Sequence, residues 1–116
     1  MELKYFKPEE FEKCVPKCSI EQMDSSFLLL LDKCRELAGV PFIITSAYRS
    51  RSWDKERGRT GNGYHTKGRA VDVVAVRGEK KRSICAACHK LGLTYGVYGN
   101  FIHIDDRDIP IVFHGR

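Results

Sequence analysis

The sequence has no long apolar run, since its longest uninterrupted aliphatic and aromatic stretch, residues 27–31, is five residues long. A membrane-spanning helix needs about 20 such residues, so we expect no membrane partner. The first ten residues also lack the apolar segment of a secretory signal. We therefore expect synthesis in the cytoplasm without a signal peptide, and export only by another route.

The sequence also contains no internal repeat, low-complexity stretch or linker. A chain of 116 residues can bury one compact core but not two. The composition, 42% hydrophobic and 30% charged, is typical of a folded globular protein. These features predict a single domain over residues 1–116, which we expect to be a monomer.

Acidic residues are too few to balance the basic ones, and the formal net charge is +5 at pH 7. The basic side chains gather between residues 49 and 69, where they form either a solvated loop or a surface for an anionic partner. There is no RNA-binding aromatic motif and no helix with a basic, base-reading face. We therefore expect no specific nucleic-acid partner, and only charge supports the alternative of a nucleic-acid-associated protein.

The five cysteines are an odd number and cannot all pair within one chain. Cys14 and Cys18 form a CxxxC motif, Cys85 and Cys88 form a CxxC motif, and Cys34 falls in the apolar stripe of a predicted helix. The two motifs are either ligands of a four-cysteine zinc site or small apolar residues in a reducing compartment. The sequence leaves both interpretations open.

Periodicity and turn residues predict an α+β domain whose small, mostly antiparallel sheet is flanked by two main helices. Residues 1–23 are predicted to be irregular, and residues 47–64 to form a long polar loop, which in so small a domain is typically functional. The expected elements are a helix over 24–38, a strand over 42–46, a strand over 69–75, a helix over 79–91, a hairpin of 93–98 with 101–104, and an edge strand or packed tail within 109–113.

Two short stretches supply the residue types of a hydrolytic metal site, namely His65, Asp72 and His103. Asp72 interrupts an apolar strand, where a carboxylate is costly to bury unless it is paired or binds a cation. Two imidazoles and one carboxylate, with a fourth position left open, suit a divalent ion such as Zn²⁺. Taken singly, Asp72 could instead pair with Arg49 or Arg69, and the histidines could be ordinary loop and sheet residues.

Three motifs together resemble the M15 zinc peptidases. These are Ser-Ala-Tyr-Arg at 46–49, HxxGxAxD at 65–72 and Phe-Ile-His-Ile-Asp at 101–105. The pattern is similar to the compact D-Ala-D-Ala carboxypeptidase-like group, often found in phages and prophages, and the resemblance runs over residues 5–107. It implies a hedgehog-like fold and hydrolysis of peptide bonds in peptidoglycan stem peptides, by a D-Ala-D-Ala carboxypeptidase or a related endopeptidase.

The resemblance also implies that His65, Asp72 and His103 hold Zn²⁺. Arg49 then resembles the cation that meets a substrate oxygen as charge develops. Such an enzyme would act on the cell wall if it were released or associated with a virion. The alternative is a wall-binding or structural module that keeps this fold but turns over weakly or not at all.

The general base is the part of the site that departs from the family pattern. Relatives often use an acid shortly before the last histidine, but Asn100 and Val97 stand at those positions here. Asp105 shares a strand face with His103, so it is expected either to act as the base or to orient a metal ligand. Glu56 and Tyr98 are the residues to consider next.

Overall fold

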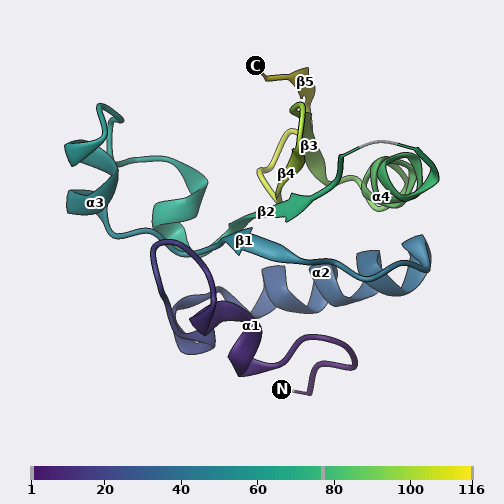
Figure 1. The fold of residues 1–116 in the computed structure, drawn as a ribbon, viewed down its shortest axis with the longest axis horizontal. Coiled ribbons are helices and arrows are strands. Elements are labelled where there is room, and N and C mark those ends of the chain that lie inside the picture. Colours follow the sequence, from purple (N-terminus) through teal and green to yellow (C-terminus); the bar gives the residue numbers. More distant parts are fainter. Residues whose placement is uncertain (1, 77, 116) are drawn as a thin grey trace.

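A computed structural model describes residues 2–76 and 78–115 (Figure 1). The helices are α1 (Pro8–Glu12), α2 (Ser25–Ala38), α3 (Arg51–Glu56) and α4 (Glu79–Lys90), and two 3₁₀ turns, η1 and η2, cover Ile20–Gln22 and Tyr64–Lys67. The strands are β1 (Ile44–Ser46), β2 (Ala70–Val74), β3 (Thr94–Val97), β4 (Phe101–Asp105) and β5 (Val112–His114). None of the described helices is long and apolar enough to cross a membrane.

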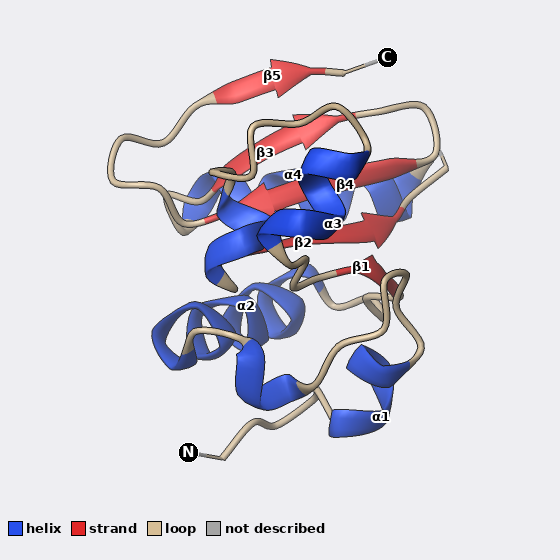
Figure 2. Cartoon of the chain, turned by 90° about the vertical axis from the view of Figure 1, so that its left-hand side faces the viewer, coloured by secondary structure: helices blue, strands red, loops and turns tan. Residues whose placement is uncertain are grey.

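One five-stranded sheet organises the chain, in the order β1-β2-β4-β3-β5. The pairs β1/β2, β2/β4 and β3/β4 are antiparallel, and only the edge strand β5 pairs in parallel, with β3. In Figures 1 and 2, α3 and α4 lie on opposite sides of this sheet. The α+β class, the mostly antiparallel sheet and the edge position of the last strand are thereby confirmed.

Strand alternation separates the core from the opposite face of the sheet. In the β2/β4 pair, Val71 opposes Ile104 and Val73 opposes Ile102, and all four side chains are fully buried. The intervening pair is Asp72 opposite His103. Because successive side chains point to opposite faces, the register that fills the core also sends these polar groups to the side of the sheet on which α3 lies.

The predicted helix over 24–38 forms as α2 and is capped at both ends. The Asp24 carboxylate accepts a hydrogen bond from the Phe27 backbone N–H at 2.9 Å. Gly39 adopts a left-handed conformation, with φ 70°, directly after the last helical residue. Phe27, Leu31 and Cys34 are fully buried, which confirms the core position of Cys34. Leu37, which helical spacing also predicts to be buried, is instead 46% exposed at the end of the helix.

Two predictions of irregular structure are wrong, because short helices occupy both regions. Residues 1–23 contain α1 and η1, and the 47–64 segment contains α3 and ends on the first residue of η2. Helix α1 buries only Phe11, and α3 buries only Asp54. A helix with one buried residue has no apolar stripe, so hydrophobic periodicity could not reveal it. The Ser50 hydroxyl, which accepts a hydrogen bond from the Trp53 N–H, was the available signal for α3.

The cysteines do not form a four-cysteine metal site. The Sγ of Cys88 lies 3.7 Å from the Sγ of Cys34, in the contact between α4 and α2, and all five cysteines are free thiols. Over residues 2–76 and 78–115, the one group of metal-ligating side chains that converges contains no cysteine. The cysteines therefore serve as small core residues, apart from Cys85, which is half-buried.

We expect Gly68→Ala to destabilise the protein more than Gly39→Ala. Both glycines have a left-handed φ, 69° and 70°, which costs an alanine about 1–2 kcal/mol. A Cβ at Gly39 would meet nothing within 4 Å, whereas one at Gly68 would lie 2.4 Å from the Gln22 carbonyl oxygen. Backbone must then shift, adding on the order of 1–3 kcal/mol. Denaturant unfolding measures both losses, and equal losses would contradict this packing.

Candidate metal centre

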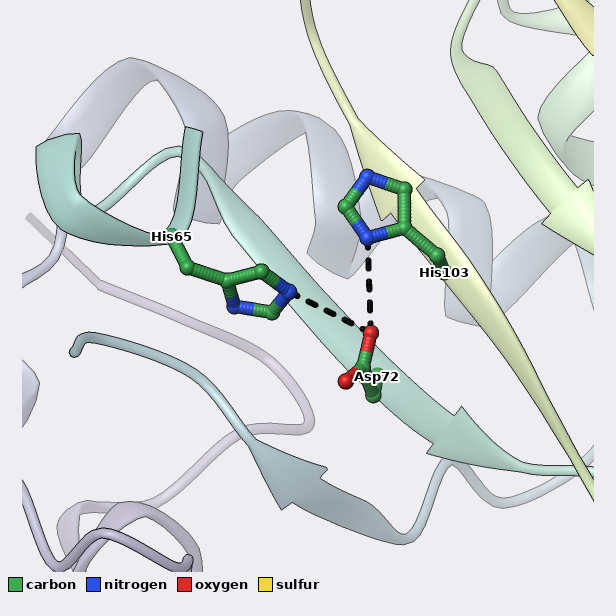
Figure 3. Close-up of side chains that lie close together, drawn as sticks. All are labelled: His65, Asp72 and His103. Atoms are coloured by element: carbon green, nitrogen blue, oxygen red, sulfur yellow. Dashed lines mark ion pairs between the residues drawn. The ribbon is translucent and has the colours of Figure 1, made fainter. Parts of the chain in front are cut away.

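Three elements bring His65, Asp72 and His103 to one point (Figure 3). His65 lies in η2, Asp72 in the middle of β2, and His103 opposite Asp72 on β4. The Asp72 Oδ1 atom is 3.3 Å from His65 Nε2 and 3.4 Å from His103 Nδ1. One ligand atom from each residue lies within 4.8 Å of the others. The structure thus brings together the three residues that the sequence singled out.

In both imidazole rings, the nitrogen that points away from Asp72 lies next to a hydrogen-bond acceptor. His65 Nδ1 lies 2.7 Å from the Ala47 carbonyl oxygen, and His103 Nε2 lies 2.7 Å from Asp105 Oδ2. In a neutral ring, the nitrogen facing such an acceptor carries the proton, and the other nitrogen presents a lone pair. Two lone pairs therefore point at the Asp72 carboxylate, an arrangement that needs a cation or a proton between them.

Asp72 is buried, and its second oxygen accepts a hydrogen bond from Arg49 Nη2 at 3.1 Å. Burial alone would raise the pKa of the Asp72 carboxyl. When the facing nitrogens of His103 and His65 also carry protons, their hydrogen bonds and positive charge outweigh burial and hold this pKa well below its usual range. The alternative partner, Arg69, is instead 2.7 Å from Asp106. Asp72 is thus kept ionised, as a metal ligand must be.

Arg49 lies across the base of the site with little exposure. Its Nε donates to the Ser46 hydroxyl at 2.9 Å, while its Nη2 contacts Asp72. Its Nη1 atom is 3.8 Å from an Asp54 oxygen. The Ser-Ala-Tyr-Arg motif therefore fixes its own arginine, because the serine at the end of β1 orients the guanidinium.

Asp105 is fully buried, and both of its oxygens are occupied. Oδ1 accepts from the Arg107 backbone N–H at 3.1 Å and from Arg107 Nε at 2.9 Å, and Oδ2 contacts Arg107 Nη2 and His103 Nε2. Burial would raise the pKa of Asp105, but the hydrogen bonds from Arg107 and His103 outweigh it and lower this pKa well below its ordinary value. These contacts suit a residue that orients His103 better than they suit a general base.

A cavity of about 370 Å³ opens over the three residues. Arg49 and Tyr98 line it, whereas Glu56 does not. Its wall also includes Phe101, from the Phe-Ile-His-Ile-Asp motif, and Arg59, from the basic segment. The sequence assigned no role in the site to the remaining wall residues Asp54, Tyr64, Arg107 and Phe113. Sequence spacing gave no sign of Phe113 or Arg59, because β5 and the end of α3 reach the site only through the fold.

The chain belongs to the Peptidase M15 family, whose model matches residues 4–105. Its fold is similar to that of the L-Ala D-Glu endopeptidase ChiX of Serratia marcescens, with a TM-score of 0.58 and 18% sequence identity. The match covers 91% of this chain and 92% of that one. A comparison with curated proteins found no significant match. The predicted M15 resemblance is confirmed, and the protein is a peptidase-family domain.

We expect Arg107→Gln to lower the free energy of unfolding at pH 7 by on the order of 3 kcal/mol, because it leaves the buried Asp105 carboxylate short of partners. The lowered pKa of Asp105 means that its stabilisation is present above about pH 4, the usual aspartate range, and is lost as pH falls through the folded-state value. The difference between variant and wild type should therefore shrink below about pH 4.

Denaturant titrations from pH 7 to pH 2.5 would measure this difference. Arg82→Gln is the control, because the Arg82–Glu79 pair is well exposed and its loss should be within experimental error. A difference for Arg107→Gln that did not change with pH would contradict an ionised Asp105.

Proposed function

We propose that this protein is a zinc-dependent peptidase that hydrolyses a bond in peptidoglycan stem peptides. The observation that carries the proposal is the convergence of the Asp72 carboxylate with the inward-facing nitrogens of His65 and His103. Membership of the M15 family supplies the reaction class. The L-Ala D-Glu endopeptidase to which the fold is similar favours an endopeptidase, with a D-Ala-D-Ala carboxypeptidase as the other member of this class.

The donor set fits Zn²⁺ in chemistry, and two of its three ligand-atom separations fit in spacing, while all three lie within 4.8 Å. Bonds of about 2.0–2.1 Å in a tetrahedron separate neighbouring ligand atoms by roughly 3.3–3.4 Å. The two separations from Asp72 Oδ1, 3.3 and 3.4 Å, match this edge length. Three protein ligands are also typical of catalytic zinc sites, which leave a position for water or substrate. We propose His65, Asp72 and His103 as the ligands.

Zinc bound there would supply a Lewis acid that activates water and polarises the scissile carbonyl. The residues of the chain would orient the metal ligands and stabilise the charge that develops on the substrate. Ala47 and Asp105 hold the two imidazoles in the tautomers that ligation needs. Arg49, fixed by Ser46, presents a guanidinium at the cavity floor, where it can stabilise the negative charge that develops on the substrate oxygen.

Incubation with purified muropeptides, followed by mass spectrometry, tests the proposal. We expect one defined product that disappears when a chelator is added and returns with Zn²⁺. Absence of any cleavage by zinc-loaded protein would reject the peptidase and leave the alternative of a wall-binding module with the same fold. The mass of the product also identifies the bond that is cut.

Zinc content tests the ligand set. We expect about one tightly bound zinc per wild-type chain and close to none in His65→Ala and His103→Ala, because each variant removes one of three ligands. Elemental analysis of the purified proteins gives the ratio, with His89→Ala as the control, since His89 lies outside the cavity. Undiminished zinc in both ligand variants would rule out the site.

Asp105→Asn distinguishes an orienting residue from a general base. We propose the orienting role, because Asp105 is fully buried behind His103 and paired with Arg107. The variant should then bind zinc about 10–100-fold more weakly, and activity should recover in part at high zinc. Zinc titration and turnover at saturating zinc measure the two effects. Unchanged zinc affinity with abolished turnover would instead establish Asp105 as the base.

Arg49→Lys should keep the fold and the zinc but lose activity by on the order of 10²-fold. A lysine preserves the charge but has no planar fork to contact Ser46, Asp72 and a substrate oxygen together. Turnover and zinc content of the same preparation are the measurements. Near-normal turnover would mean that Arg49 pairs with Asp72 but does not stabilise charge on the substrate.

A further inference from the structure

Three arginines line the cavity, Arg49, Arg59 and Arg107, and each lies beside a buried carboxylate, those of Asp72, Asp54 and Asp105 respectively. The formal charges of these six side chains balance. A divalent ion at the proposed metal site would therefore leave the cavity with an excess of positive charge. Such a cavity attracts an anionic ligand.

Two of the three guanidiniums are already engaged. Arg49 donates to Ser46 and Asp72, and Arg107 donates to Asp105 through two nitrogens. Arg59 differs from both, because within residues 2–76 and 78–115 its guanidinium donates no hydrogen bond, and 48% of its side chain is exposed. It is therefore the arginine whose donors are available to a ligand.

Asp54 holds Arg59 at the cavity wall in two ways. The Arg59 backbone N–H donates to the Asp54 carbonyl oxygen at 3.1 Å, which folds the chain back against the end of α3. The Arg59 Nη1 atom also lies 3.5 Å from Asp54 Oδ1. The backbone tether fixes where the side chain starts, and the ion pair fixes the direction in which it points.

Asp54 is itself an unusual residue, since it is 2% exposed and is the only buried residue of α3. Within the part of the chain that the structure describes, its Oδ1 atom has no hydrogen-bond partner and faces two guanidiniums, Arg49 at 3.8 Å and Arg59 at 3.5 Å. A buried carboxylate is costly without such neighbours. Its position is explained if it places both arginines for a ligand in the cavity.

We infer that Arg59 binds a carboxylate of the substrate and makes the enzyme selective for acidic peptides, with Asp54 as its positioning residue. The inference rests on the proposed peptidase function and adds a specificity residue to it. A guanidinium presents paired donors that match the two oxygens of a carboxylate, and a charged pair of this kind is stronger than a neutral hydrogen bond.

The test uses the peptide L-Ala-γ-D-Glu-L-Lys-D-Ala-D-Ala and two analogues. In one analogue the D-Glu α-carboxylate is a carboxamide, and in the other the C-terminal carboxylate is a carboxamide. Dissociation constants and kcat/KM are measured with zinc-loaded wild type, Arg59→Gln and Arg57→Gln. Arg57 is the matched control, because it is the neighbouring half-exposed arginine, stacks over Trp53 at 3.6 Å and does not line the cavity.

We expect one of the two carboxamides to bind wild type and Arg57→Gln about 10–100-fold more weakly than the parent peptide. Arg59→Gln should bind the parent peptide as weakly as that carboxamide and no longer distinguish the two. Asp54→Asn should reduce the same discrimination, a ratio that a purely structural role would leave unchanged.

Equal discrimination by Arg59→Gln and wild type would overturn the inference, and so would a wild type that binds all three peptides equally. Binding is measured separately from cleavage, so the two proposals can fail independently. If the protein distinguishes the parent peptide from a carboxamide but cleaves neither, the peptidase is rejected and the carboxylate site is retained. If it cleaves the peptides without distinguishing them, the carboxylate site is rejected and the peptidase is retained.

Discussion

The antiparallel pairing of β2 with β4 is the constraint on which the site depends. One register places Val71 and Val73 against Ile104 and Ile102 in the core, and the same register sets Asp72 beside His103 on the other face. A slip by one residue would exchange the faces, burying the polar pair and exposing the aliphatic side chains. The register that packs the core therefore also places Asp72 and His103, so the hydrophobic effect fixes the geometry of the site.

The second requirement is compensation for charge that the fold buries. Asp72, Asp105 and Asp54 are all buried on the cavity side of the sheet, and each faces at least one arginine. Their partners lower the pKa of Asp72 and of Asp105 and keep both carboxylates ionised, at the cost of removing several charges from water. The result is a rigid polar wall in which Asp105 fixes His103 and Asp54 lies between two guanidiniums. Such preorganisation suits a site that must hold its ligands in one geometry.

Membership of the M15 family and the proposed zinc site also explain why Asp105 lies where it does. An acid buried behind a ligand histidine increases the basicity of that ligand, and the Arg107 contacts keep the acid ionised. Asn100 and Val97, which stand shortly before His103, are not acids, so the proposed chemistry relies on the metal, on Arg49 and on positioning. Tyr98 and Phe101, whose ring centroids stack 4.3 Å apart, form an aromatic part of the cavity wall.

The sequence by itself determined the α+β class, the main helices and strands, and the three residues that converge. These features follow from local patterns, namely strand alternation, the α2 stripe and an aspartate inside an apolar strand. Only the tertiary structure decided the roles around them. It placed Arg107 on Asp105, paired Asp72 with Arg49 rather than Arg69, and brought Asp54, Arg59 and Phe113 to the cavity. Apart from the Asp105–Arg107 pair, whose residues are two positions apart, those contacts join residues distant in the chain or helices with no apolar stripe, so no local pattern encodes them.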